Sequence, residues 1–477
     1  MALAPRANGL DRLDAILLLI LASSVLASYL AFLARSPFIY GWDGPYYLTQ
    51  VRHIARTGSL KYADPPLAFY YFYAMYVLVG DITLGVKVGT AIMVALMVVP
   101  VYCLVKQELG RRPEAVLSAV VLALNPQLLK LSSEWLKNLV GSTFLMFSAF
   151  SFARGVERDE RKALVASSIS LMATSLTHIL AFSLSVLFLA LYTIFTAICH
   201  KEKAADVLEA FILVSLAPTT LILAGFPLLP AYFSDLLKIK AFVNDVLFPS
   251  SNGSYYMPLL VEQCMAYAVL GVSIMGFLVA IKHALSREKE KAVLTLTLST
   301  IGVLISAPIT PPAWYCRIFL MGFFPNSILV PMVAYEVRLL SDIAPLLPPK
   351  LRHELTTAFA AFFLVLPTLL LSGLGSAFAG PSLSDVEFSD LMLMASSVPK
   401  GSVVVVAPNQ ALGYWAEYIL DCDFSRELSP HLFTSYEHVL IIVGPGLDKP
   451  LLPMRLLYAG EVLALYELIP PPIGAGA

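Results

Sequence analysis

The sequence contains few charged residues: Asp, Glu, Lys and Arg make up only 14% of its 477 residues, and 58% are hydrophobic. Soluble domains carry about a quarter charged residues, so this scarcity excludes an ordinary soluble protein. The net charge of −1 supplies no electrostatic field that would favour nucleic acid as a partner. The composition therefore predicts a polytopic membrane protein.

The chain lacks three further features. Its five cysteines are scattered and do not have the spacing of a metal site. No A-x-A-like cleavage site follows the first apolar run, Ala15 to Leu33, so we expect this run to remain as a span rather than to be removed as a signal peptide. No internal repeat is evident, which weighs against the inverted-repeat transporters.

Long apolar runs are what the sequence has instead. About 20 mostly apolar residues span a bilayer, so we expect a polytopic α-helical membrane protein with about eleven transmembrane helices. The runs lie at 14–34, 82–105, 114–129, 138–153, 163–178, 179–198, 207–225, 258–281, 292–309, 317–336 and 355–373.

One further segment, 65–80, is apolar and aromatic but short. Lys and Arg accumulate in cytoplasmic loops. If 65–80 does not cross, the predicted inner loops carry about twice as many Lys and Arg as the predicted outer loops. We therefore expect interfacial helices in the first outer loop, a cytoplasmic N-terminus and location in the cell membrane.

The pattern changes near Pro381. The stretch "KGSVVVVAPNQALGYWAEYIL" indicates a turn, a buried strand, a loop and a helix, and "HVLIIVGPG" and "EVLALYELIP" indicate two more strands. The sequence thus predicts a transmembrane domain at 1–380 and a small extracytoplasmic α/β domain at 381–477.

Five polar residues at the edges of spans are candidates for function, because such groups are costly in a membrane. The charge-based topology places all five at the same outer face: Asp43, Lys87, Glu134, His178 and Arg317. Two carboxylates and a histidine can hold a divalent cation such as Mg, Mn or Zn, and two cations can hold a phosphate. These residues therefore favour a site at the outer membrane surface.

Four of the five also have a structural interpretation. Asp43 can cap a surface helix that has Pro45 in its first turn. Glu134 suits the first turn of the next helix, His178 can hydrogen-bond at the interface, and Lys87 can snorkel outward. Arg317 is the exception, because it opens a long apolar span and its guanidinium fork favours phosphate.

The first 200 residues resemble a known family. "GWDGPYY", then "DPPLAFYYFYAMYVLVGDITLGVKVG", then "LGRR" are similar in order to the opening of the GT-C superfamily of integral-membrane glycosyltransferases. This superfamily includes protein O-mannosyltransferases, aminoarabinose transferases and oligosaccharyltransferase catalytic subunits. The shared features are an acidic residue in the first outer loop, a Pro-Pro-Leu aromatic helix, a basic residue early in the next span and a basic inner end.

The resemblance implies transfer of a sugar from a polyprenyl-phosphate- or pyrophosphate-linked donor to a lipid, protein or glycan acceptor on the extracytoplasmic side. It implies that Asp43 is a catalytic base or metal ligand and that Glu134 matches a second acidic site. Lys87 and Arg317 would bind the lipid phosphate. His178 would contribute to the site wall or the metal site, which would then comprise Asp43, Glu134 and His178.

The C-terminal region departs from the oligosaccharyltransferase pattern. That group carries Trp-Trp-Asp-Tyr-Gly in its outer domain, whereas this chain has only the loosely similar "GYWAEYILD". We retain Trp415 and Tyr418 from this stretch, with Trp42 and Tyr46 beside Asp43, as candidate acceptor contacts or site walls. Two other functions remain open: a transporter or flippase of a lipid-linked anion, and a non-catalytic GT-C-like subunit.

Overall fold

The computed structural model describes residues 10–247, 260–286, 289–307, 312–343, 380–407, 409–444 and 452–470. The chain divides into two compact units. Unit 1 is Met1–Phe32, Ala63–Tyr71 and Val88–Phe378, and unit 2 is Leu33–Tyr62, Phe72–Lys87 and Ala379–Ala477. Unit 2 thus joins the C-terminal segment to two segments from the N-terminal part of the chain.

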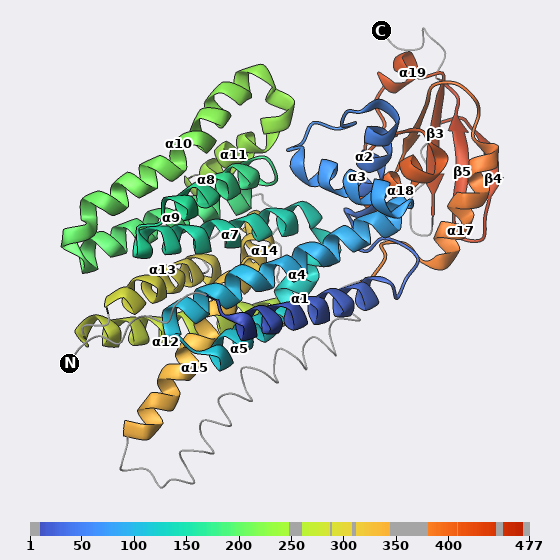
Figure 1. Cartoon of the computed structure of the whole chain (residues 1–477). Helices are drawn as coiled ribbons and strands as arrows, with labels where there is room; N and C mark the ends of the chain where they lie inside the picture. The colour runs from blue at the N-terminus through green and yellow to red at the C-terminus, as the bar shows by residue number, and fades with distance from the viewer. Residues whose placement is uncertain are drawn as a thin grey trace. The chain divides into compact units, whose positions relative to one another are not determined.

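Unit 1 is built of helices (Figure 1), in which α7 packs on α8 and α9, and α12 packs on α13 and α15. Two more helices, α3 (Leu67–Val79) and α4 (Ile82–Leu109), have residues in both units. The elements of unit 1 are α1 (Arg12–Leu33), α5 (Arg112–Ala123), α6 (Pro126–Glu134), α7 (Leu136–Arg158), α8 (Arg161–Ser175), α9 (Ile179–Cys199), η1 (Lys201–Lys203), α10 (Ala204–Leu228), η2 (Pro230–Leu236), α11 (Leu237–Leu247), α12 (Leu260–Leu285), α13 (Lys289–Ser306), α14 (Pro312–Leu320) and α15 (Phe323–Ile343).

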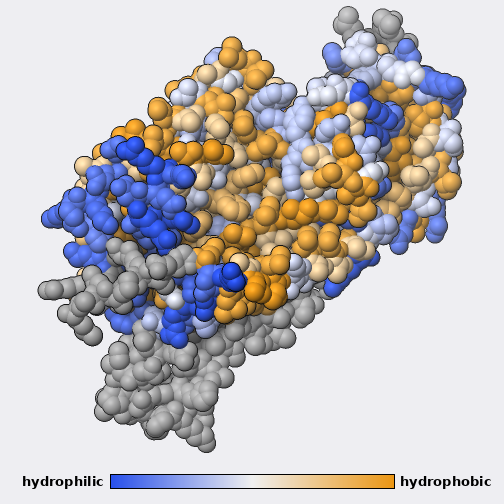
Figure 2. Space-filling model, viewed as in Figure 1, coloured by the Kyte–Doolittle hydropathy of each residue, from blue (hydrophilic) through white to orange (hydrophobic). Residues whose placement is uncertain are grey.

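These helices present apolar side chains to their surroundings. Figure 2 shows hydrophobic residues along the sides of the visible helices of unit 1, and Ile198, Leu216 and Leu223 are more than half exposed. Within the described residues, six helices are long and apolar enough to cross a membrane, or seven if the bent pair α5 and α6 is one span. The expected multi-pass helical class is confirmed, and the expected run at 355–373 lies outside the described residues.

The expected run at 114–129 is divided between two helices bent by 45°. The break follows from two residues. The side chain of Asn125 accepts a hydrogen bond from the Gln127 backbone N–H at 2.9 Å and so caps α6. Pro126 follows in the first turn of α6, where its missing N–H costs nothing.

Unit 2 contains a five-stranded sheet of strand order β2-β1-β3-β5-β4. Strand β1 pairs in parallel with β2 and β3, whereas β5 pairs antiparallel with β3 and β4. Helix α18 packs against α2, the surface helix that begins after Asp43. The elements are α2 (Gly44–Thr57), α17 (Asp385–Met394), η3 (Ala395–Ser397), β1 (Val403–Val406), α18 (Gln410–Leu420), β2 (Asp423–Ser425), α19 (Leu432–Ser435), β3 (His438–Val443), β4 (Met454–Ala459) and β5 (Ala464–Leu468).

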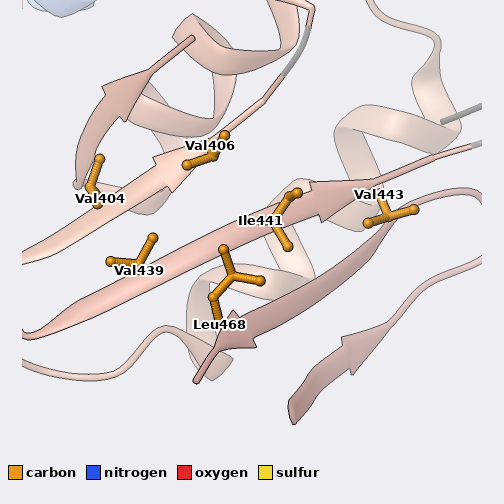
Figure 3. Close-up of a cluster of buried hydrophobic side chains, with 6 residues drawn as sticks. All are labelled: Val404, Val406, Val439, Ile441, Val443 and Leu468. Atoms are coloured by element: carbon orange, nitrogen blue, oxygen red, sulfur yellow. The ribbon is translucent and has the colours of Figure 1, made fainter. Parts of the chain in front are cut away.

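The core of this sheet is aliphatic. Figure 3 shows six buried side chains from β1, β3 and β5, namely Val404, Val406, Val439, Ile441, Val443 and Leu468. These are the three strands that the sequence predicts, since each forms a short apolar run. Strands β2 and β4 were missed because β2 has three residues and β4 is a half-buried to exposed edge strand whose apolar residues are interrupted by Arg455.

Candidate functional site

A pocket of about 130 Å³ lies in unit 1 where α9 begins, and α11 and α14 supply its other walls. Most of its wall is apolar, but two cations and a histidine also line it. We call it the cationic pocket; it is lined by His178, Ile179, Leu180, Ser183, Lys238, Ile239, Phe242, Trp314, Arg317 and Ile318. An apolar wall with a few polar groups is the usual composition of a ligand site.

Local contacts hold the walls of this pocket together. His178 is the N-cap of α9, and its Nδ1 accepts a hydrogen bond from the Leu180 backbone N–H at 3.2 Å. The Trp314 indole N–H donates to Asp245 Oδ2 at 2.7 Å, and the Trp314 ring meets Phe242 edge to face at 5.6 Å. These contacts join α11 to α14, the helices that carry the two cations of the pocket.

Arg317 differs from Lys238, the other cation of the pocket. It is exposed, and among the residues that the structure describes no carboxylate pairs with it. A guanidinium with no carboxylate partner, placed beside an apolar wall, can bind an anion without first giving up an ion pair. The expectation that Arg317 would be hard to explain as a structural residue therefore remains.

Lys238, itself half-buried, belongs to a network of charges around buried carboxylates in the same unit. Asp235, only 3% exposed, forms ion pairs with Lys238 and with Lys137, the latter at 3.7 Å. Lys137 Nζ also lies 2.6 Å from Asp64 Oδ1. Burial raises the pKa of the Asp235 carboxyl, but Lys137 and the other nearby positive groups outweigh it and lower this pKa to about 2.

The predicted residue Glu134 is not at the start of a helix. It is the last residue of α6, and the hydroxyls of Ser132 and Ser133 donate back to the carbonyls of Leu129 and Lys130 rather than capping α7. The helix-start interpretation of Glu134 is therefore wrong. A carboxylate at the C-terminal end of a helix is unfavourable, so the helix dipole of α6 does not account for it.

Asp43 occupies the N-cap position of α2, with proline in the first turn, as the sequence predicts. Its side chain, however, makes no capping hydrogen bond. Capping therefore explains where the helix begins but not why a carboxylate is at this position. The neighbouring Trp42 is 63% exposed, an unusual state for so large an aromatic side chain.

Lys87 does not snorkel, so that interpretation is wrong. Its residue is 5% exposed, and its Nζ donates to the Ser36 carbonyl at 2.5 Å. The ammonium also lies 5.9 Å from the centre of the Tyr40 ring. A carbonyl and an aromatic face thus solvate this ammonium, and the Asp81 carboxylate attracts it as well.

The remaining candidates lie in unit 2. Tyr46 is half-buried and stacks on Tyr62 with ring centres 5.8 Å apart, and the Arg52 guanidinium lies 4.8 Å from the centre of the Tyr418 ring. Trp415 is 2% exposed and donates its indole N–H to Ser382 Oγ at 3.0 Å. Trp415 is thus a core residue of unit 2, and we no longer propose it as an acceptor contact.

The predicted metal ligands belong to different units, Asp43 to unit 2 and Glu134 and His178 to unit 1. Among the described residues, no group of three or more His, Cys, Asp or Glu side chains is arranged to hold a metal ion. His178 interacts electrostatically with one carboxylate, Asp235, and with three positive groups, Lys137, Lys238 and Arg317, which together would repel a divalent cation. The donor set around His178 therefore does not fit a metal.

Sequence reasoning found two residues of the cationic pocket, His178 and Arg317, and missed Lys238. It also missed the carboxylates of the network, Asp64 and Asp235. The sequence holds only a weak sign of this ion pair. In "YFSDLLKIK" an acidic and a basic residue stand among apolar residues and are three positions apart, which places them about one helical turn from each other.

Comparison with known proteins bears on the fold. Residues 63–222 match the family described as dolichyl-phosphate-mannose-protein mannosyltransferase. No curated protein sequence matches the chain. This family match covers Asp64, Lys87, Glu134 and His178 and ends before Lys238.

Solved structures match much more of the chain. Archaeal oligosaccharyltransferase AglB from Archaeoglobus fulgidus, in complex with an inhibitory peptide and a dolichol-phosphate, has a TM-score of 0.59 and 13% identity, over 87% of this chain and 65% of that one. ArnT from Cupriavidus metallidurans bound to undecaprenyl phosphate has a TM-score of 0.55 and 14% identity, over 97% of this chain and 99% of that one. The chain thus spans about two thirds of the length of AglB and nearly all of ArnT. It has the fold of the GT-C superfamily of integral-membrane glycosyltransferases, and the predicted resemblance is confirmed.

Proposed function

We propose that this protein is a membrane glycosyltransferase that moves a sugar from a polyprenyl-phosphate- or pyrophosphate-linked donor to an acceptor on the extracytoplasmic face. The observation that carries the proposal is the cationic pocket of unit 1. A polyprenyl phosphate has an apolar chain and an anionic head, and the pocket offers apolar walls together with Lys238 and Arg317. Both ligand-bound relatives carry such a lipid phosphate, which supports the same class of donor here.

Arg317 is the proposed main phosphate ligand. Its five N–H donors can bind two phosphate oxygens at once. Lys238 lines the same pocket but is paired with Asp235, so Arg317 is the proposed direct contact and Lys238 contributes positive charge beside it. Lys87, held at the Ser36 carbonyl in unit 2, stays a proposed phosphate-binding residue, as the family resemblance implies.

The proposed reaction needs a base and a stabilised leaving group. The acceptor oxygen or nitrogen attacks the anomeric carbon of the sugar, and Asp43 takes the proton that the acceptor loses. The bond between the anomeric carbon and the phosphate oxygen breaks, and its electron pair leaves with the lipid phosphate. Positive groups stabilise that developing charge. Glu134 remains a proposed second carboxylate of the site. Adding a chelator to protein that transfers sugar tests separately whether a metal contributes.

The test is sugar transfer by the full chain in phospholipid nanodiscs, with radiolabelled polyprenyl-phosphate sugars as donors and Asp43→Asn beside wild type. Asp159→Asn is the matched control, because Asp159 ends α7 in a left-handed conformation that Asn also adopts. We expect transfer by wild type and the control, and loss of transfer in Asp43→Asn.

The same experiment separates the alternatives. Sugar transfer by Asp43→Asn at the wild-type rate would contradict the role of this carboxylate, but the protein would still be a glycosyltransferase. Absence of transfer from every donor, with the lipid still bound, would support a non-catalytic subunit. Movement of the labelled lipid between leaflets without transfer would support a flippase.

A further inference from the structure

A second pocket, of about 240 Å³, lies within unit 2 and has a different character. One face of α2 supplies part of its wall, and the segments before β1 and β2 supply the rest. We call it the polar pocket; it is lined by Thr49, Arg52, His53, Arg56, Lys61, Gly401, Ser402, Val403, Asp421, Cys422 and Asp423. None of the residues proposed for sugar transfer lines it.

One group in this pocket has no structural explanation. Thr49 is 1% exposed, and its hydroxyl has no hydrogen-bond partner. Native proteins rarely leave a buried hydroxyl unpaired, because its lost hydration is not replaced. Thr49 lines the pocket, but its oxygen is buried, so a ligand in the pocket would satisfy it only after the Thr49 side chain turns towards the cavity.

The cations of the polar pocket are already paired with carboxylates. Lys61 Nζ lies 2.7 Å from Asp423 Oδ1 and also pairs with the buried Glu417. Arg56 Nη1 lies 2.7 Å from Asp421 Oδ1. An anion would have to displace these carboxylates and would be repelled by them. The pocket is therefore unsuited to phosphate, unlike the cationic pocket of unit 1.

Paired charges still offer many hydrogen bonds. Carboxylate oxygens and guanidinium N–H groups have more bonding sites than one ion pair uses. Burial and the nearby Lys61 and Arg56 lower the pKa of His53, so at neutral pH its ring supplies one donor and one acceptor. Such a wall matches hydroxyl groups, each of which both donates and accepts.

A glycine stands at the edge of the pocket, just before β1. Gly401 has φ +124°, which favours glycine, and a Cβ there would point at Glu437, which does not line the pocket. The cavity is smaller than the 300–1,000 Å³ or so that drug-sized ligands occupy, which limits the ligand to about one ring.

We propose that the polar pocket binds one neutral sugar ring, as part of a glycan. The ring hydroxyls contact Thr49, His53 and the exposed edges of the Arg56–Asp421 and Lys61–Asp423 pairs. Arg52 has a different role, because its guanidinium donates to the Glu417 carbonyl at 3.0 Å and so holds the end of α18. This binding is independent of sugar transfer and needs no donor lipid.

The test is saturation-transfer NMR on the full chain in phosphatidylcholine nanodiscs, with free glucose, galactose, mannose and N-acetylglucosamine as probes. Thr49→Val is the central variant, since it removes the unpaired hydroxyl and keeps the shape of the side chain. Thr57→Val is the matched control on the same helix, because Thr57 is exposed and does not line the pocket.

We expect at least one sugar to bind wild type and the control, and to bind Thr49→Val about tenfold more weakly, the effect of one hydrogen bond. Arg56→Gln should weaken binding as well. Failure of every sugar to bind wild type, or equal binding by Thr49→Val, would overturn the proposal. Displacement of the sugar by millimolar inorganic phosphate would overturn it in favour of an anion site.

Discussion

The two pockets differ in how their positive charges are paired. In the cationic pocket of unit 1, Lys238 pairs with Asp235, but Arg317 has no carboxylate partner within the described residues, and apolar side chains form most of the wall. In the polar pocket of unit 2, Lys61 and Arg56 each have a carboxylate partner within 2.7 Å, and polar side chains form most of the wall. The presence of basic residues alone would not separate the two pockets.

Whether the positive side chains are paired with carboxylates, rather than how many there are, therefore indicates the kind of ligand. An unpaired guanidinium beside apolar walls suits an amphipathic anion. Paired charges around a polar cavity suit a neutral ligand with many hydroxyls. Four predictions follow from this difference, from the largest expected effect to the smallest.

Lys137→Met should be the most destabilising of these changes. It would leave Asp64 and Asp235 buried with no Lys137 to pair with, and breaking a buried pair in this way costs about 3–5 kcal/mol. Thermal unfolding in detergent measures the loss. Lys240→Met is the control, because Lys240 is exposed and surface changes are usually within about 0.5 kcal/mol; an equal loss in both variants would contradict the network.

Arg317→Gln should lower sugar transfer about 100-fold, as loss of one charge-stabilising donor does in other enzymes. Folding should be unchanged, since Arg317 is exposed and has no carboxylate partner among the described residues. Initial rates at saturating donor, with Lys240→Gln as control, measure the effect. Wild-type rates for Arg317→Gln would show that this residue binds no phosphate.

Acid should destabilise the Asp235 network. The pKa of this carboxyl is about 2 in the folded protein and 3.8 when unperturbed, so its contribution is complete above pH 3.8 and is lost as the pH falls towards 2. The shift corresponds to about 2 kcal/mol. Asp235→Asn should abolish this part of the pH dependence; an unchanged slope in unfolding midpoints between pH 5 and 2 would contradict the assignment.

Thr49→Val should have the smallest effect on stability, and in the favourable direction. Replacing an unpaired buried hydroxyl by a methyl group removes an unmet hydrogen bond, so we expect a gain of up to about 1 kcal/mol. Denaturant unfolding of the ligand-free protein measures it. Marked destabilisation would mean that the Thr49 hydroxyl already has a hydrogen-bond partner, and the proposal of a ligand in the polar pocket would lose its main support.

The sequence predicted the helical membrane class and the three apolar strands, because both depend on local runs of apolar residues. It predicted His178 and Arg317 because polar groups stand out at the edges of such runs. It missed Asp235 and Lys238, which lie in a segment that the sequence predicts to be an outer loop, where charged residues are ordinary. The importance of this pair arises from the burial of Asp235 beside Lys137, about 100 positions away along the chain, and local patterns do not report such pairing.

The structure also reversed several local interpretations. The sequence suggested that Lys87 snorkels and that Glu134 begins a helix, since both ideas follow from position in the chain. Lys87 is instead held at the Ser36 carbonyl, and Glu134 ends α6. Trp415 resembled an acceptor contact from its neighbours in sequence, but it packs in the core of unit 2.

The most direct test of the account is to map where a polyprenyl phosphate binds. A photoreactive polyprenyl phosphate would be crosslinked to the full chain in nanodiscs, and the modified peptides identified by mass spectrometry. We predict adducts on residues of the cationic pocket such as Ile239, Phe242 and Ile318, and their loss in Arg317→Gln but not in Lys240→Gln. Adducts confined to peptides of the polar pocket, or unchanged by Arg317→Gln, would contradict the account.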